Sequence, residues 1–279
     1  MRIALINSGI GLLAAAAELH RRRPDADLVL AMDPDGMPWG PRNPADIAQR
    51  SLAFARAAAE YGPDVMVMAC NTDSVHAIEA LRAEFEPAIP IVGTVPAIKP
   101  AAAVAESVAI WATVATTASA YQRQLIADFA GGARVTAIAC PGLADAVDAG
   151  DEEGTRAAVA DGASRTPADC GAVVLGCTEY ELAADLIAAA VPGAAMFGSA
   201  AAVAAQALRR AGAADHGGPA AGEPASGTVR VLLSGRPAAL PPAALRYPAG
   251  RLLARLEPGR RGAPLPRRTA AAAARSVSA

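Results

Sequence analysis

The fold of this chain is most constrained by two short apolar segments, each of which ends in a cysteine. Residues 65–69 precede Cys70, and residues 173–176 precede Cys177. Continuous runs of β-branched and long apolar residues with polar neighbours are typical of buried parallel strands. The carboxyl ends of such strands line the ligand crevice of open α/β sheets. The matched pair therefore predicts two acid/base thiols that face one substrate carbon. The alternative is that each cysteine packs as a small apolar side chain.

The rest of the chain alternates between strand and helix patterns over short distances. Further strands are expected at residues 2–6, 28–31, 89–92, 108–113, 135–139 and 229–234. Helices are expected at residues 44–61, 75–85, 120–130 and 152–160, the first with Asn43 as its N-cap. This alternation favours an α/β fold that is built from parallel βαβ units with right-handed crossovers.

Composition and charge narrow the class of protein. The 279 residues suffice for a core in one or two domains, and the net charge of −2 favours neither a nucleic-acid nor a membrane partner. No secretory signal is recognisable, so we expect a cytoplasmic protein with reduced thiols. Asp185 and Pro192 interrupt the apolar run of residues 183–208, which disfavours a membrane span. The cysteine spacings predict no metal site, and Cys140 and Cys170 are interpreted as structural.

The two cysteine segments also imply two similar halves. A boundary is expected near residues 96–100, and a second crossing near residues 197–201. The first domain would comprise residues 1–97 plus about 200–250, and the second would comprise residues 98–199. Residues 251–279 are rich in Arg, Pro and Ala and are expected to form a disordered tail.

Motifs along the chain add a resemblance. They are Asn-Ser-Gly-Ile-Gly at 7–11, Pro-Trp-Gly-Pro-Arg at 38–42, Ala-Cys-Asn-Thr at 69–72, Pro-Ala-Ile-Lys-Pro at 96–100, Leu-Gly-Cys-Thr-Glu-Tyr at 175–180 and Leu-Ser-Gly-Arg-Pro at 233–237, with Thr113, Thr116, Ser119 and Tyr121 between the fourth and the fifth. In order and spacing they resemble motifs of the cofactor-independent glutamate racemases, in the aspartate/glutamate racemase superfamily, up to roughly residue 250.

The resemblance implies a fold, a site and an activity. The fold would have two pseudo-symmetric αβα domains with mostly parallel sheets, and the active site would lie at their interface. The activity would be the interconversion of L- and D-glutamate by two cysteines, without pyridoxal phosphate or another cofactor. The resemblance also implies a supply of D-glutamate for peptidoglycan synthesis, and it suggests a homodimer.

The chemistry of racemisation explains why two thiols are useful. A proton must leave one face of Cα, and another must arrive on the opposite face. Cys70 and Cys177 can alternate as base and acid, whereas a single thiol would return the proton to the same face. A helix is expected after each cysteine, and its first N–H groups would favour the thiolate.

Short polar side chains near the cysteines are candidates for binding the ammonium and carboxylate groups of an amino acid. The candidate substrate-binding residues are Asn7, Ser8, Pro38, Trp39, Gly40, Asn71, Thr72, Thr113, Thr116 and Thr178. For the hydroxyl and amide residues among them, the alternative role is that of helix caps and turn formers.

Three residues depart from the racemase pattern. Asn7 stands where glutamate racemases carry an acidic residue, and an amide cannot relay a proton. Glu179 replaces a histidine, and as a carboxylate it would assist Cys177 catalytically but, when ionised, raise the pKa of the thiol. Asp148 stands where the family tends to have glutamate and is a candidate acid/base assistant.

His76 is interpreted as a solvent-facing helix residue.

These departures leave alternatives to glutamate racemisation. The substrate could be aspartate or another amino acid, or the reaction could be a decarboxylation that needs only one cysteine. A catalytically impaired binding homologue is the alternative outside enzymes, and it rests on Asn7 and Glu179.

Overall fold

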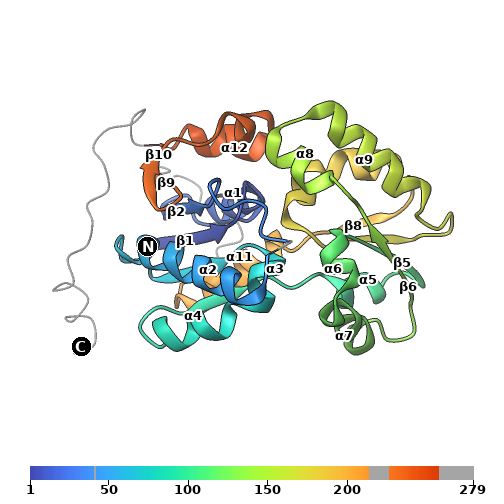
Figure 1. Cartoon of the computed structure of the whole chain (residues 1–279), viewed down its shortest axis with the longest axis horizontal. Coiled ribbons are helices and arrows are strands. Elements are labelled where there is room, and N and C mark those ends of the chain that lie inside the picture. Colours follow the sequence, from blue (N-terminus) through green and yellow to red (C-terminus); the bar gives the residue numbers. More distant parts are fainter. Residues whose placement is uncertain (41, 214–225, 258–279) are drawn as a thin grey trace.

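The computed structural model describes residues 1–40, 42–213 and 226–257, which form two α/β units, each built around its own sheet (Figure 1). The larger sheet has the strand order β10-β9-β2-β1-β3-β4, and only β10 is antiparallel to its neighbour. Its strands are β1 (Arg2–Asn7), β2 (Asp27–Met32), β3 (Val65–Met68), β4 (Ile91–Gly93), β9 (Val229–Leu233) and β10 (Arg236–Ala238).

The smaller sheet is wholly parallel and has the strand order β6-β5-β7-β8. Its strands are β5 (Ser107–Ala112), β6 (Arg134–Ala139), β7 (Ala172–Leu175) and β8 (Ala195–Phe197). The strand that precedes each cysteine, β3 or β7, lies inside its sheet beside the first strand of that sheet, β1 or β5. The two cysteines therefore occupy equivalent positions in the two halves.

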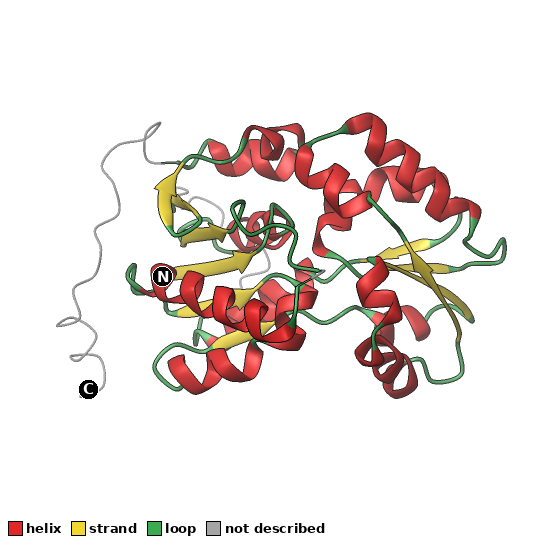
Figure 2. Ribbon diagram, viewed as in Figure 1, coloured by secondary structure: helices red, strands yellow, loops and turns green. Residues whose placement is uncertain are grey.

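Helices cover both faces of each sheet (Figure 2). Around the larger sheet lie α1 (Leu12–Arg22), α2 (Pro44–Ala59), α3 (Asn71–His76), α4 (Ile78–Phe85), α11 (Ala200–Arg210), the 3₁₀ helix η2 (Pro242–Arg246) and α12 (Pro248–Ala254). Around the smaller sheet lie α5 (Ile98–Ala102), α6 (Val114–Ala118), α7 (Ala120–Phe129), α8 (Leu143–Ala149), α9 (Glu152–Ser164), the 3₁₀ helix η1 (Thr178–Ala183) and α10 (Ala184–Ala190).

The continuous apolar runs arise because side chains on both faces of a strand are buried. In β1, Ile3 and Leu5 pack toward α1, α11 and α12, whereas Ala4 and Ile6 pack toward α2 and α4. Each fully buried aliphatic side chain of this size contributes about 1.5–3 kcal/mol to folding. The same alternation divides β5, where Trp111 lies in the cluster with α8 and α9. The predicted α/β fold with mostly parallel sheets is thus confirmed.

The strands predicted between residues 2 and 176, the strand at 229–234 and the four helices are all confirmed, with shifts of a few residues at their ends. Asn43 caps α2 as expected, because its side-chain oxygen accepts a hydrogen bond from the Asp46 N–H at 2.9 Å. The short strands β8 and β10 and the helix α1 were not predicted. The helical segment expected at 75–85 begins earlier, at Asn71, and is divided at Ala77 into α3 and α4.

One expectation about the second half of the chain is wrong. A tail was predicted from residue 251, but Arg251 lies in α12, and Leu253 and Leu256 are buried in the core with α1. The remainder of that segment, from residue 258, lies outside the described residues. The helix expected directly after Cys177 is the 3₁₀ helix η1, so α-helical geometry begins only at Ala184.

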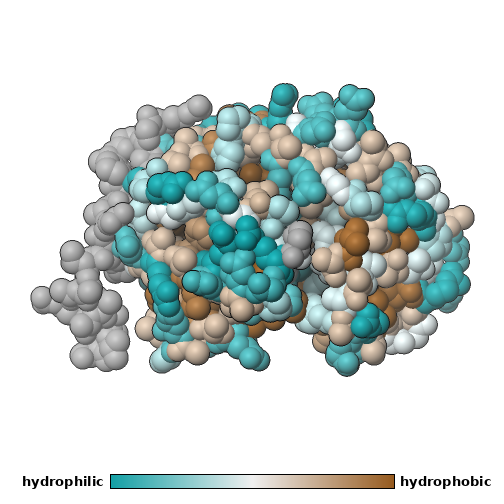
Figure 3. Space-filling model, viewed as in Figure 1, coloured by the Kyte–Doolittle hydropathy of each residue, from teal (hydrophilic) through white to brown (hydrophobic). Residues whose placement is uncertain are grey.

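The apolar run of residues 183–208 is divided among α10, β8 and α11. In the described part of the chain, no helix has both the length and the apolar character that a membrane span requires. On the face shown in Figure 3, hydrophobic residues gather on the half that carries the smaller sheet, beside the junction with the other half.

Candidate active site

A cavity of about 390 Å³ lies between the two sheets, and both Cys70 and Cys177 line it. Cys70 follows β3, and Cys177 follows β7, so one thiol comes from each half of the fold. The β1–α1 loop contributes Ser8, and the start of α6 adds Thr113. The cavity is therefore an interdomain crevice at the carboxyl ends of parallel strands, where such folds bind ligands.

The Cys177 thiol is paired with a carboxylate. Its Sγ donates a hydrogen bond to Glu179 Oε2 at 2.8 Å, and Glu179 is buried. Burial and the neighbouring Glu179 carboxylate raise the pKa of Cys177 well above its ordinary value. Glu179 is therefore placed to accept the proton of Cys177, which the thiol must lose to act as a base.

Cys70 lies at the N-cap of α3, in extended backbone conformation. The Thr72 and Asp73 N–H groups bond to its sulfur and lower the pKa of the thiol, as the expected helix N-terminus should. Burial and the carboxyl groups of Asp73 and Glu179 outweigh them, so the pKa of Cys70 is raised overall. The predicted effect of the helix N–H groups on the thiolate is thus present, but desolvation and the nearby carboxyl groups outweigh it.

Asp73 is a residue that sequence reasoning did not assign to the site. It is fully buried, and Ser51 on α2 donates a hydrogen bond to its Oδ1 atom. Its other oxygen has no partner in the described structure. Burial raises the pKa of Asp73 to about 7. An acidic residue in the first turn of the helix after Cys70 was the available signal, but burial decides its charge.

Asn7, at the end of β1, joins the two halves. Its Nδ2 donates to Ala69 O at 2.8 Å, to Thr178 Oγ1 at 3.2 Å and, more weakly, to Glu179 Oε1 at 3.5 Å. Asn7 Oδ1 accepts from Ser8 Oγ at 3.2 Å. The two residues that depart most from the racemase pattern, Asn7 and Glu179, therefore contact each other.

Close approach of the halves requires glycine in the β1–α1 loop. A Cβ atom at Gly9 would lie 2.3 Å from Asp148 Oδ1, and one at Gly11 would lie 2.4 Å from Glu179 Oε1. Asp148 Oδ1 accepts from the Ile10 N–H at 2.8 Å. Burial and the Glu179 charge raise the pKa of Asp148, so its carboxyl group is held protonated well above the usual range.

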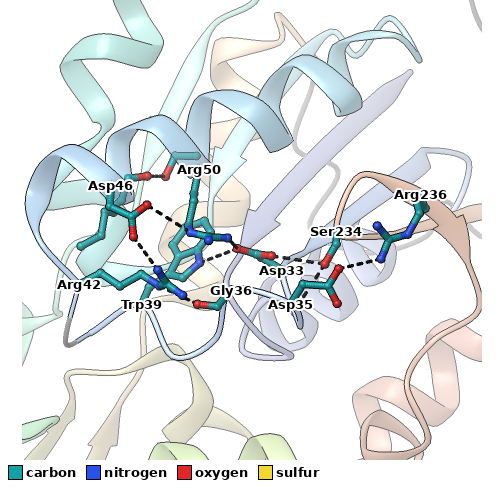
Figure 4. Close-up of polar contacts among 11 residues, drawn as sticks. Asp33, Asp35, Gly36, Trp39, Arg42, Asp46, Arg50, Ser234 and Arg236 are labelled. Atoms are coloured by element: carbon teal, nitrogen blue, oxygen red, sulfur yellow. Dashed lines mark hydrogen bonds and ion pairs between the residues drawn. The ribbon is translucent and has the colours of Figure 1, made fainter.

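The loop segment of residues 36–40 forms another wall of the cavity through Pro38, Trp39 and Gly40. Figure 4 shows that Asp33, at the end of β2, anchors this loop. Asp33 Oδ2 accepts from Trp39 Nε1 and from Arg50 Nη1, both at 2.9 Å. Trp39 is 1% exposed, so its indole shapes the wall and keeps its N–H turned to Asp33.

The structure places the predicted residues in three groups. The cavity is lined by Ser8, Pro38, Trp39, Gly40, Cys70, Thr72, Thr113, Asp148, Cys177 and Glu179. Asn7 and Thr178 are buried directly behind Glu179. Asn71 and Thr116 line an adjoining cavity instead. Thr113 also has the alternative role of a cap, since its Oγ1 accepts from the Thr116 N–H at 3.2 Å.

Other cysteine and histidine predictions have mixed outcomes. Cys140 is buried, as a structural cysteine should be, but it also lines the main cavity together with the unpredicted Asp145. Cys170 is buried in the core of the smaller sheet. His76 is exposed at the end of α3, as interpreted. Among the described residues no group of His, Cys, Asp and Glu is arranged to hold a metal ion.

The buried carboxyl group of Asp73 gives a pH-dependent stability prediction. Its pKa of about 7 in the folded chain exceeds the unfolded value near 3.9, so the folded state binds more protons in between and loses stability as pH rises. Asp73→Asn keeps an acceptor for Ser51 and removes this loss. We expect urea unfolding to show that the variant gains about 2–4 kcal/mol relative to wild type between pH 4 and pH 8. A pH-independent difference would contradict the assignment.

Comparisons with known proteins agree with this geometry. The Asp/Glu/Hydantoin racemase family model matches residues 3–207. A glutamate racemase of Herpetosiphon aurantiacus is 37% identical over 242 residues, which are 85% of this chain and 93% of the relative. One from Pseudomonas putida is 36% identical over 226 residues, covering 76% of this chain and 82% of the relative.

Among solved structures, the glutamate racemase of Escherichia coli, in complex with L-glutamate and the activator UDP-MurNAc-Ala, superimposes with a TM-score of 0.74 at 28% identity. The match covers 88% of this chain and 91% of that chain. The fold is thus that of the two-domain racemases, a class of isomerases. The chain belongs to the Asp/Glu/hydantoin racemase family.

Proposed function

We propose that this protein is a cofactor-independent glutamate racemase that works with two thiols. The observation that carries the proposal is that Cys70 and Cys177, from the two halves of the fold, line one cavity. In the cytoplasm the proposed product, D-glutamate, would supply peptidoglycan synthesis. The similarity to curated glutamate racemases over most of the chain supports glutamate as the substrate.

The proposed proton transfers use residues on the two sides of the cavity. Glu179 accepts the proton of Cys177, and the thiolate then removes the Cα proton from one face of the substrate. The Cys70 thiol donates its proton to the other face, and the reverse direction exchanges the two roles. The product is the opposite enantiomer, and the Cys70 thiolate is reprotonated before the next turnover in the same direction.

The charges of the cavity fit an amino-acid substrate. Its described lining contains Asp145, Asp148 and Glu179 but neither Lys nor Arg. The Asp145 carboxyl group suits the substrate ammonium, while Ser8 and the threonines offer hydroxyl donors to its carboxylates. Asp148, held protonated, is proposed to assist as a proton donor, and the donors near Cα stabilise the developing carbanion.

Incubation with L-glutamate in D₂O tests the proposal. We expect deuterium to enter Cα and the optical rotation to decay to zero, as followed by proton NMR and polarimetry. Exchange with aspartate or another amino acid but not with glutamate would reassign the substrate within the family. Ligand binding in a calorimeter without any exchange would instead identify an impaired binding homologue and overturn the proposal.

A further inference from the structure

The proposed proton transfers do not use Asp33, a buried acidic residue that directly follows β2. It is 1% exposed, and it is not among the described residues that line the cavity with the two thiols. Its main-chain N–H donates to Ser8 O at 3.0 Å, so it lies beside the β1–α1 loop. Burying a carboxyl group is costly unless its oxygens are paired, and the partners of Asp33 therefore indicate its role.

The loop segment of residues 36–40 bonds to both the main chain and the side chain of Asp33. The Gly36 and Met37 N–H groups donate to Asp33 O, each at 3.1 Å. Asp33 Oδ2 accepts from Trp39 Nε1 and from Arg50 Nη1 (Figure 4). A Cβ atom at residue 36 would overlap Asp33 Oδ2 and the Arg50 guanidinium, so glycine allows the close approach. The segment therefore folds tightly around one side chain.

Ser234, in the turn between β9 and β10, contacts Asp33 from the other side (Figure 4). Its Oγ donates to Asp33 Oδ1 at 3.4 Å and accepts from the Asp35 N–H at 3.2 Å. Its φ of 45° lies in the left-handed region, which residues other than glycine adopt at a cost. Such a conformation persists where surrounding contacts fix it, so the Asp33 carboxyl group is held on two sides.

Trp39 connects Asp33 to the cavity. Its indole is buried against Phe54, with the ring centroids 6.1 Å apart. Pro38 is exposed and Gly40 is partly exposed, and both line the cavity. Because the buried indole lies between these two residues in the chain, a displacement of Trp39 displaces the wall of the cavity.

We propose that Asp33 is a positioning residue for substrate binding, because its hydrogen bond to Trp39 keeps Pro38 and Gly40 in place along the cavity wall. This role rests on the proposed racemase function and concerns the affinity of the same site. The wall contacts the substrate before and during proton transfer but exchanges no proton with it. It contributes equally to binding of the ground state and the transition state, so its loss raises KM and leaves kcat unchanged.

Three substitutions test this contact, with deuterium exchange at Cα of L- and D-glutamate as the assay. Trp39→Phe keeps an aromatic ring but removes the N–H donor, and Asp33→Ala removes the acceptor. Each should raise KM by about five- to tenfold for both enantiomers and change kcat by less than about twofold. Asp33→Asn retains an oxygen that can accept from Trp39, so its KM should stay within about twofold of wild type.

Trp111→Phe is the matched control. Trp111, in β5, is also fully buried, and its Nε1 donates to Thr166 Oγ1 at 2.9 Å. The substitution removes an equivalent hydrogen bond away from the cavity, so KM should not change. Urea unfolding compares the stability of the two tryptophan variants. The double variant Asp33→Ala/Trp39→Phe should have the KM of the more impaired single variant, because both substitutions remove one contact.

Fluorescence gives a second readout. The sequence has two tryptophans, so Trp111→Phe leaves Trp39 as the only one. In that variant L-glutamate should change the emission of Trp39. Adding Asp33→Ala should shift the emission of the free protein to longer wavelength and raise the glutamate concentration at half of the change by about five- to tenfold.

The possible outcomes separate the two proposals. An unchanged KM in Asp33→Ala or Trp39→Phe, an equal rise in Trp111→Phe, an equal rise in Asp33→Asn, or additive rises in the double variant would overturn the positioning role and leave the racemase proposal intact. If the wild type exchanges no glutamate, the racemase proposal is overturned, and the fluorescence titration decides whether Asp33 positions the wall. The absence of both exchange and an emission change with glutamate would overturn both.

Discussion

Cys70→Ser and Cys177→Ser should each abolish racemisation of L- and D-glutamate, with a loss of at least about 10³-fold in kcat. A serine hydroxyl is a far weaker acid than a thiol, so it can supply neither base nor acid at the pH of the assay. The remaining thiol can still remove and return a proton on its own face. Each variant should therefore exchange the Cα proton of only one enantiomer, and the two variants should prefer opposite enantiomers. Chiral chromatography and proton NMR in D₂O measure both effects.

Cys170→Ser provides the control for this pair. Cys170 is about as buried as Cys70 but lies in the core of the smaller sheet, where its Sγ contacts Ala172 O at 3.1 Å. It should retain racemisation in both directions. Full turnover by either Cys70→Ser or Cys177→Ser would contradict a two-thiol mechanism and favour a reaction that needs one cysteine, such as a decarboxylation.

Asn7→Asp should lower the racemisation rate by about 100-fold, although it restores the acidic residue that glutamate racemases carry. An Asp oxygen would replace the Asn7 N–H that now donates to Ala69 O at 2.8 Å and faces Glu179 Oε1 at 3.5 Å. The introduced carboxylate oxygen would then face Ala69 O and Glu179 Oε1, which are also acceptors, and its negative charge would be repelled by that of Glu179. Glu179→His alone should also be impaired, because Cys177 loses the carboxylate that accepts its proton.

The double variant Asn7→Asp/Glu179→His tests whether residues 7 and 179 act together in racemisation or whether each substitution lowers the rate independently. It brings together the acidic residue and the histidine of the glutamate-racemase pattern, so we expect it to recover at least about tenfold over the Asn7→Asp variant. Urea unfolding of the wild type, the two single variants and the double variant shows whether a lower rate reflects a lower free energy of unfolding. Additive losses in the double-mutant cycle would show that the contact between Asn7 and Glu179 has no part in activity.

Much of the fold could be predicted because strands that are buried on both faces must be continuously apolar. Residues 65–69 and 173–176 carry this signal, and both correspond to strands. The three-residue strands β8 and β10 carry too short a pattern to recognise. The end of the ordered chain was misjudged because Leu253 and Leu256 stand in an Arg-rich segment, and their burial against α1 is a long-range contact.

In the candidate site, too, local sequence signals predicted some residues, whereas the roles of others depend on contacts between residues that are distant in the sequence. Spacing and residue type were enough to select Cys70 and Cys177, which follow β3 and β7, and the resemblance to the racemase motif added Glu179. Asp73 was missed because its importance comes from burial against Ser51 on another helix. The separation of Thr116 from the main cavity depends on how α6 and α7 pack beside α3.

The sequence by itself determined the α/β class, the pairing of two cysteine-bearing strand ends and the racemase resemblance. These features follow from hydrophobic periodicity and from local motifs, both of which can be recognised in the order of residues along the chain. Only the tertiary structure decided the charge state of the thiols, the contact between Asn7 and Glu179, and the contact between Asp33 and Ser234. Each of these depends on burial and on distances between residues that are remote in sequence, because desolvation and Coulomb interactions act through space.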